Sequence, residues 1–308
     1  MVFSLNYGYI RYTKSIIIKM SRSKRHHYIP QFFLKGFTNK ENKFFVYDLK
    51  QDRFYDTPIV PKNVFLEKNR NTHTINGEKT DFIETEIFGV LDHSAALLLK
   101  RIRESKQLSI DDAAELYKFL ATTFWRVPSN DSRAQEKIQN SSLKSLGIEI
   151  KHKETGETAP EELINKLKSL SAFTDIIRLA SPLWEMQKNI GNYDYKHWSC
   201  GIDRGHNITG DMPVIVRNED IDDIFCSEFI FPVSSNKTIY YSNGKKLSLS
   251  KSDKRLRKKL DILLVLKSQI QVCGRDKIYL ENVINSSKVY QRESQVEALK
   301  EEVFSVFK

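Results

Sequence analysis

Cysteine is scarce in this chain of 308 residues, in which only Cys200, Cys226 and Cys273 occur, far apart and without a C-x-x-C pair. Such spacing argues against a disulfide framework and a thiolate zinc site, and it is typical of a reducing compartment. We therefore expect a cytoplasmic protein. A long apolar run is also absent, since no segment approaches the roughly 20 apolar residues that a membrane-spanning helix needs.

Several catalytic motifs are missing as well. The sequence has no H-E-x-x-H, no P-loop, no G-x-S-x-G and no dinucleotide fingerprint. These absences argue against assigning the chain to the zinc proteases, the P-loop nucleotide hydrolases, the α/β-hydrolases or the dinucleotide-dependent oxidoreductases. No internal repeat is visible, which argues against a solenoid.

The first residues lack the features of a targeting segment. The apolar run 16–18 is too short for a signal peptide, and no small-residue cleavage site follows it. Met20 is a more economical start. We therefore expect residues 1–20 to be a poorly ordered or mis-assigned extension that is dispensable for function, and residues 21–308 to form a single α+β domain.

Positive charge is what the sequence has in excess, with 49 Lys and Arg against 39 Asp and Glu and a formal net charge of +10. Such a balance favours a polyanionic partner, either nucleic acid or an anionic membrane surface, although a well-solvated basic surface explains it equally well. Two stretches carry much of the charge. Residues 1–36 contain seven basic residues and no acidic one, and residues 245–259 contain eight basic residues against Asp253.

The second stretch opens an expected helix, where positive charge opposes the helix dipole. Contact with a phosphate backbone explains such a run better than a purely structural role, although solvated charge is the commoner outcome. The candidate nucleic-acid-binding residues from both stretches are Lys24, Arg25, Lys254, Arg255, Arg257 and Lys258.

The order of expected elements indicates the fold class. Aromatic runs at 43–49 and 53–55 flank a polar turn and predict a hairpin. Apolar residues at helical spacing predict helices over 80–104 and from Ser109 to about Arg126. Later segments predict strands at 197–202, 212–217, 229–233, 238–241 and 288–290. They also predict helices at 252–272 and 294–307. Because βαβ alternation is absent, we expect an α+β fold with a helix-rich middle, an N-terminal hairpin and a C-terminal, mostly antiparallel sheet.

The densest motif in the chain is 24–37, Lys-Arg-His-His-Tyr-Ile-Pro-Gln-Phe-Phe-Leu-Lys-Gly-Phe. Pro30 favours extended backbone before it and can occupy the first turn of a short helix. Phe33, Leu34 and Phe37 give this helix an apolar stripe, and Gly36 can end it. The sequence therefore predicts that the histidines are held at the N-terminal end of a short helix that packs on the core.

Six separated segments resemble a known family, domain-of-unknown-function family 4238. The family hallmark, His-Tyr-(Val/Ile)-Pro-(Gln/Arg)-x-(Tyr/Phe)-Leu-x-x-Phe, is matched by residues 27–37. The other matching segments, in the family's order, are Ile83-Glu84, Arg126-Val127-Pro128, Trp198, Thr209-Gly210-Asp211-Met212-Pro213-Val214 and Phe231-Pro232-Val233-Ser234. The resemblance spans roughly residues 22–295 and implies one integrated domain in a cytoplasmic, mostly microbial protein, without an established activity. His26 is not a fixed part of the hallmark, so the resemblance implies less for it than for His27.

His27 is the leading candidate for chemistry, because an imidazole can act as general base, general acid or metal ligand near neutral pH. The structural alternative is that its ring bonds to a backbone carbonyl and fastens the N-terminal segment to the core. A lone histidine more often has the structural role. Here the functional role gains nearly equal weight, because Gln31 lies one helical turn further on and the basic Lys24 and Arg25 are close by.

Three further residues complete a candidate catalytic set. Asp211 either makes a turn with its own backbone or presents a ligand or base at a strand end, and Gly210 beside it permits close approach. Glu84 has a dipole or capping role as its simpler explanation. Arg126 follows an apolar helical turn, so it needs a carboxylate (Asp211 or Glu84) or a substrate phosphate.

Together, His27, Gln31, Glu84, Arg126 and Asp211 could bind and cleave a phosphodiester, with Mg²⁺ or Mn²⁺ held by carboxylates and with His27 and Asp211 as candidate ligands. The first hypothesis is accordingly a protein that acts on nucleic acid, such as a metal-assisted nuclease of microbial defence or toxin type. The alternatives are a non-catalytic nucleic-acid-binding module with a structural His motif, and an enzyme acting on a small phosphorylated ligand.

Overall fold

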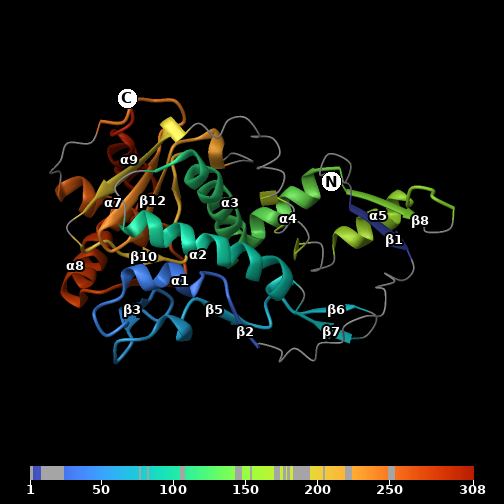
Figure 1. Ribbon diagram of the computed structural model, residues 1–308, viewed down its shortest axis with the longest axis horizontal. Helices are drawn as coiled ribbons and strands as arrows, with labels where there is room; N and C mark the ends of the chain where they lie inside the picture. Colours follow the sequence, from blue (N-terminus) through green and yellow to red (C-terminus); the bar gives the residue numbers. More distant parts are fainter. Residues whose placement is uncertain are drawn as a thin grey trace.

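The computed structural model describes residues 3–7, 24–75, 78–81, 83–104, 108–142, 148–152, 155–169, 174–175, 178, 181–182, 195–203, 205–218, 224–248 and 254–308. The predicted α+β class is confirmed, because helices fill the middle of the described sequence and antiparallel sheets come from both ends (Figure 1). The sequence also predicts a helix over 172–190, and most of these residues lie outside the described ranges.

The first sheet joins the two ends of the chain. Its strand order is β10 (Thr209–Gly210), β14 (Gln271–Gly274), β3 (Phe45–Asp48) and β4 (Arg53–Phe54), and each pair is antiparallel. The predicted hairpin is confirmed as β3 and β4. The predicted helix 252–272 is too long, because it ends at Lys267 and the chain then forms β14, which pairs Val272 with Tyr47.

The second sheet lies in the C-terminal half and has the order β11 (Ile215–Val216), β12 (Phe229–Ser234), β13 (Lys237–Tyr241) and β9 (Trp198–Ile202). Its neighbouring strands are antiparallel. Every residue of β12 and β13 is buried, because the sheet is covered on both faces. This explains why strands in 229–241 read as continuous apolar and aromatic runs.

Helices α2 (Gly89–Glu104) and α3 (Ile110–Arg126) pack against each other across the middle of the molecule (Figure 1). Ser109 starts α3 as predicted, because its side chain accepts from the Asp112 amide while the Asp112 carboxylate accepts from the Ser109 amide. The helix predicted from residue 80 begins later, since Glu78–Thr80 is strand β7 and Ile83–Phe88 is a π-helix that precedes α2.

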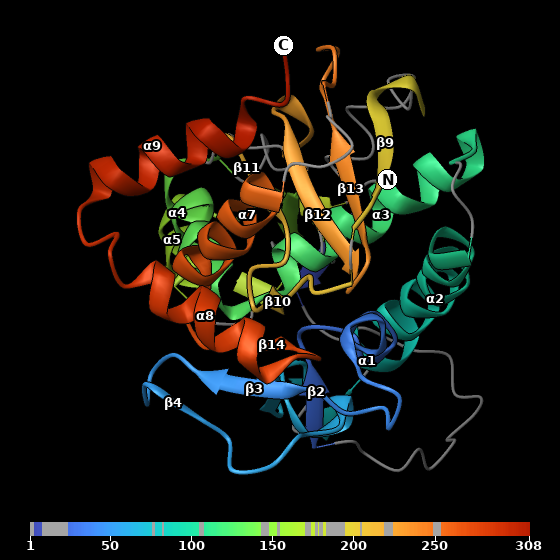
Figure 2. The same cartoon turned by 90° about the vertical axis from the view of Figure 1, so that its left-hand side faces the viewer.

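Three helices, α7 (Lys254–Lys267), α8 (Lys277–Ser287) and α9 (Glu293–Phe304), gather at the C-terminal side, as Figure 2 shows. The strand predicted at 288–290 is wrong, because these residues form the turn between α8 and α9. The remaining elements are β2 (Arg25–His27), α1 (Gln31–Leu34), η1 (Lys35–Phe37), η2 (Pro61–Asn63), β5 (Leu66–Lys68), β6 (His73–Ile75), η4 (Pro128–Asn130), α4 (Asp131–Asn140), α5 (Glu161–Lys168), η5 (Tyr195–His197) and η6 (Ile224–Cys226).

Two hydrophobic clusters form the described core. The larger one centres on the motif 24–37 and packs Phe33 and Phe37 against α2, α3 and β12, with Phe33 stacked on Phe231 at 5.2 Å between ring centroids. The second one lies between α7, α8, α9 and the first sheet. The predicted apolar stripe of the motif is therefore the anchor of the larger cluster.

Within residues 1–20, Phe3–Tyr7 forms strand β1, which pairs in parallel with β8 (Ile148–His152). The rest of 1–20 lies outside the described residues, and the poor order of 1–20 stays a prediction. Whether 1–20 is dispensable, and whether 21–308 is one domain, stay predictions. Among the described helices, none is long and apolar enough to cross a membrane.

Candidate functional site

Strand β2 presents its residues alternately to solvent and to the core. Arg25 is exposed, His26 is buried and His27 is half-buried. The antiparallel partner β5 sets Arg25 opposite Lys68 and His27 opposite Leu66. Because directly paired residues share a face of a sheet, Arg25, Lys68 and His27 lie on one face of this two-stranded ribbon.

His26 has a structural place in the fold. Its side chain is fully buried, and its Nδ1 atom accepts a hydrogen bond of 2.9 Å from the Asn71 amide. This bond joins β2 to the loop after β5. The sequence-based ranking of His27 above His26 as the candidate for chemistry therefore agrees with the exposure of the two rings.

The His27 imidazole hydrogen-bonds the carbonyl of Lys62, as the structural alternative expected, while its Nε2 atom is buried without a hydrogen-bond partner in the described part of the chain. Burial, together with the positive charge of Arg126, lowers the pKa of His27 below its usual 6.5, and the Glu84 carboxylate opposes this shift. A neutral imidazole can accept a proton at neutral pH. His27 is thus kept in the form that a general base requires.

Behind His27, Arg126 is held by two carboxylates. Its Nη1 atom donates to both oxygens of Asp92 at 2.9 and 3.0 Å, and its Nη2 atom lies 3.7 Å from Glu84 Oε1. The guanidinium carbon lies 4.2 Å from the centre of the Phe88 ring. Asn71 Nδ2 donates to Glu84 Oε2 at 2.7 Å, which fixes the other side of that carboxylate.

This cluster has one permanent cation against two carboxylates. Burial raises the pKa of Asp92, while Arg126 acts in the opposite direction. Since the charge of Arg126 is already matched, and its side chain is only 2% exposed, the cluster offers little attraction to a phosphate. The structural alternative for Arg126, a carboxylate partner, is what the fold contains, and Asp92 is the closer partner that sequence reasoning missed.

Asp211 is fully buried, and its carboxylate connects the segment after β10 to residues 269–271 and to η4. Oδ1 accepts from the amides of Ile270 and Gln271 at 2.9 Å, and Oδ2 accepts from the Gln269 amide at 3.0 Å and Ser129 Oγ at 3.1 Å. Among the described contacts, none joins Asp211 to His27, Glu84 or Arg126. The set expected to converge is therefore only partly assembled, with Asp211 bonded elsewhere.

Gln31 begins α1 and is exposed. The expectation that it lies one helical turn from His27 is wrong, because His27 belongs to β2 and Pro30 separates strand from helix with extended backbone (φ −60°, ψ 139°). Four residues span one turn only inside a helix. The helical spacing therefore gives no reason to place Gln31 beside His27.

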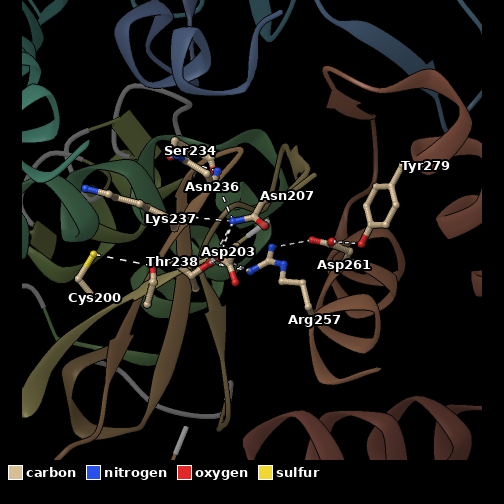
Figure 3. A network of polar contacts seen from close by, with 11 residues as sticks. Cys200, Asp203, Asn207, Ser234, Asn236, Lys237, Thr238, Arg257, Asp261 and Tyr279 are labelled. Carbon is tan, nitrogen blue, oxygen red and sulfur yellow. Dashed lines mark hydrogen bonds and ion pairs between the residues drawn. The ribbon is translucent and has the colours of Figure 1, made fainter. Parts of the chain in front are cut away.

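Arg257, expected at a nucleic-acid surface, instead belongs to a buried network that Figure 3 shows. Its Nη2 atom donates to Asp261 at 2.7 Å, and its Nη1 atom donates to Thr238 Oγ1 at 2.6 Å and lies 3.4 Å from Asp203 Oδ2. Tyr279 donates its hydroxyl to Asp261 at 2.6 Å. Burial alone would lower the pKa of Arg257, but the carboxylates of Asp261 and Asp203 raise it above its usual value. This residue ties α7 to β13 and is not available to a phosphate.

The rest of the second basic stretch is also partly neutralised. Lys245 pairs with Glu228, and Lys259 pairs with Glu302. Arg255 and Lys258 are exposed on the first turns of α7, whereas the Lys254 side chain lies outside what the structure describes. The first stretch differs, since Lys24 and Arg25 are both exposed at the edge of the motif, where Lys62 and Lys68 are exposed as well.

A carboxylate and histidine grouping for a metal was a further expectation, with His27 and Asp211 as candidate ligands. In the described ranges, no group of three or more His, Cys, Asp or Glu side chains could hold a metal ion. His27 and Asp211 belong to separate sets of contacts.

The family hallmark can now be compared with the fold. A family model described as a protein of unknown function (DUF4238) matches residues 25–278, which begin at β2 and end in α8. The chain belongs to the DUF4238 family. This DUF4238 match contains the His27 cluster, Asp211, and Arg257 with Asp261, while Tyr279 and α9 lie beyond it. No curated protein and no solved structure matches the chain significantly.

Proposed function

We propose that this DUF4238 protein binds nucleic acid through four basic residues on and beside the β2–β5 ribbon. These residues, which we call the ribbon cations, are Lys24, Arg25, Lys62 and Lys68, and all four are exposed. In Figure 1, β2 and β5 lie side by side at the lower edge of the molecule. Cations gathered in this way are the usual means by which proteins contact phosphate backbones.

The observation that carries the proposal is the direct pairing of Arg25 with Lys68 across the ribbon. Like charges at facing positions of an antiparallel pair are destabilising. The Arg25 head is also held beside η2, because its Nη2 atom donates to the Lys62 carbonyl at 2.9 Å and to Asn63 Oδ1 at 3.2 Å. A bound polyanion removes the repulsion that this arrangement concentrates.

Comparison of the two basic stretches supports the same surface. The stretch at 245–259 has Arg257 inside the fold and two of its lysines paired with glutamates. In the ribbon, the only carboxylate on either strand is Glu67, and it lies opposite the buried His26 and pairs with Arg70. Among the described contacts, no carboxylate pairs with Lys24, Lys62 or Lys68, whereas two lysines of the second stretch pair with glutamates.

Phosphodiester cleavage is a second candidate, and the place of His27 favours it. His27 lies on the same face of β2 as Arg25, and its lowered pKa leaves the ring neutral at neutral pH. Its Nε2 atom is buried, so cleavage requires the substrate to reach that atom. A cleaving activity would fit the defence or toxin role expected from the sequence. The three cysteines are free thiols, which supports a cytoplasmic location as part of this proposal.

Binding is tested by fluorescence anisotropy with labelled DNA and RNA at low salt, alongside vesicles of anionic and of neutral lipid. Lys62→Ala/Lys68→Ala is the test variant, and Lys246→Ala/Lys258→Ala, which removes two exposed lysines of the second stretch, is the matched control. We expect the test variant to lose about tenfold or more in nucleic-acid affinity and the control to stay near wild type. Equal losses in both variants, or binding to anionic vesicles alone, would contradict the proposal.

Cleavage is tested separately with the same substrates, with Mg²⁺ or Mn²⁺ and then with a chelator. His27→Gln should abolish cleavage while leaving affinity within about twofold of wild type. If labelled substrates stay intact under every condition while binding persists, the second candidate is rejected and the binding function stands.

A further inference from the structure

We infer that the bound nucleic acid is a duplex, contacted through its phosphate backbone without reading of the bases. This inference rests on the proposed function and specifies its substrate class. Two features of the ribbon carry it, namely the burial of its aromatic rings and the engagement of its arginine.

Proteins that hold single strands usually stack bases on exposed aromatic side chains. The aromatic rings beside β2 and β5 are instead turned inward, because Tyr28 is 2% exposed and Phe65 is 1% exposed. The two rings pack edge to face with centroids 6.2 Å apart. In the described stretch from η2 through β5 and in β2, the only partly exposed ring is His27, whose Nε2 edge is buried. The ribbon therefore lacks a stacking platform.

Base reading in a groove depends chiefly on arginine forks or amide groups that make paired hydrogen bonds to base edges. The Nη2 atom of Arg25 already donates both to the Lys62 carbonyl and to Asn63 Oδ1, so one of the two terminal nitrogens that a paired contact with a base edge would use is engaged within the protein. The other ribbon cations are lysines, which act as point charges rather than as paired donors. The surface thus presents charge at fixed places but few groups that could distinguish one base from another.

A surface of this kind selects its ligand by density of negative charge. A duplex carries about one phosphate charge per 1.7 Å of axis, and it releases more counterions per contact than a single strand. With four ribbon cations, up to about four phosphates can be neutralised. A duplex of DNA or of RNA therefore fits the surface better than an unstructured single strand.

The experiment compares four labelled ligands of about 20 nucleotides per strand at one salt concentration. They are a GC-rich DNA duplex, an AT-rich DNA duplex, an RNA duplex and single-stranded oligo-dT. We expect the three duplexes to bind within about threefold of one another and about tenfold more tightly than oligo-dT. Tighter binding of oligo-dT, or a difference of about tenfold or more between duplex sequences, would overturn the inference while leaving nucleic-acid binding intact. Absence of binding to all four would reject the proposed function itself.

A second variant tests the role given to Arg25. Arg25→Lys keeps the charge and removes the fork, so we expect its duplex affinity and its lack of sequence preference to stay within about twofold of wild type. A preference of the wild type for one of the two DNA duplexes that disappears in Arg25→Lys would show that the fork reads bases, contrary to the inference. Arg25 is exposed, so the substitution leaves the core unchanged.

Discussion

Gly36 and Arg103 occupy adjoining space, since a Cβ atom built on Gly36 would lie 2.6 Å from Arg103 Nη2. The Arg103 guanidinium lies against the end of the family hallmark, where it donates to the carbonyls of Phe32 and Phe33 at 3.0 and 2.9 Å and to Val233 at 3.1 Å. Burial lowers the pKa of Arg103 to about 10, so it remains a cation at neutral pH. Gly36, which stands at a variable position of the hallmark, thus makes room for a buried arginine that joins α1 to β12.

Gly36→Ala is expected to destabilise the protein by about 3 kcal/mol, because the added methyl group meets both the guanidinium and the Val233 carbonyl at 2.8 Å. The free energy of unfolding in urea measures this. Gly89→Ala is the control, since a Cβ at Gly89 meets only the Glu84 carbonyl at 3.6 Å. An unchanged midpoint for Gly36→Ala would contradict the assignment of the glycine to Arg103.

Asp211→Asn is expected to cost about 3 kcal/mol of stability, because either orientation of the amide sets an NH₂ group against backbone N–H donors of 269–271. Ser129→Ala removes only the hydroxyl bond to Asp211 and should cost about 1 kcal/mol. Thermal and urea unfolding check both values. A fully stable Asp211→Asn variant that loses cleavage would restore the catalytic interpretation of this aspartate.

Asp92→Asn is expected to destabilise the protein by roughly 3 kcal/mol, since among the described residues Glu84, at 3.7 Å, is then the one anionic partner left for the buried Arg126. Asp111→Asn, an exposed carboxylate in the first turn of α3, is the matched control and should change stability by less than about 1 kcal/mol. Equal effects of the two substitutions in urea unfolding would show that Arg126 does not depend on Asp92.

The stability of the wild type should fall relative to His27→Gln as the pH is lowered from about 7.5 to about 5. The folded-state pKa of His27 lies below the unfolded value near 6.5, so the unfolded chain binds the proton more readily. The stabilising contribution of the neutral ring is therefore complete above the unfolded pKa and is lost as the pH falls below it. Urea unfolding at each pH gives the comparison.

His93→Gln is the control for this pH series, because His93 is exposed on α2. It should follow the wild-type curve throughout. If wild type and His27→Gln change in parallel, His27 is not held in its neutral form by the fold.

Local signals explain what the sequence predicted well. The capping pair Ser109 and Asp112, the hairpin of β3 and β4 and the apolar stripe of the motif depend on neighbours within a few residues. The strand β14 was missed because its pairing partner lies more than 200 residues away in β3. Propensity alone could not separate it from the end of α7, since the long-range ladder decides its conformation.

The contacts of the candidate site residues could not be predicted for the same reason, because residue spacing does not determine which side chains pair across the fold. Arg126 requires an anionic partner, but nothing in the sequence selects Asp92 from the other acidic residues. Arg257 is different, since Asp261 stands four residues further along the same helix, the spacing at which opposite charges pair. That signal was present in the basic run and would have removed Arg257 from the list of surface residues.

The most direct test of the proposed function is the salt dependence of duplex binding between about 50 and 200 mM salt. We predict a wild-type slope of log affinity against log salt of about −3 to −4, which Lys62→Ala/Lys68→Ala makes shallower by about two and Lys246→Ala/Lys258→Ala leaves unchanged. An unchanged slope in the ribbon variant, or an equal reduction in both variants, would contradict binding through the β2–β5 ribbon.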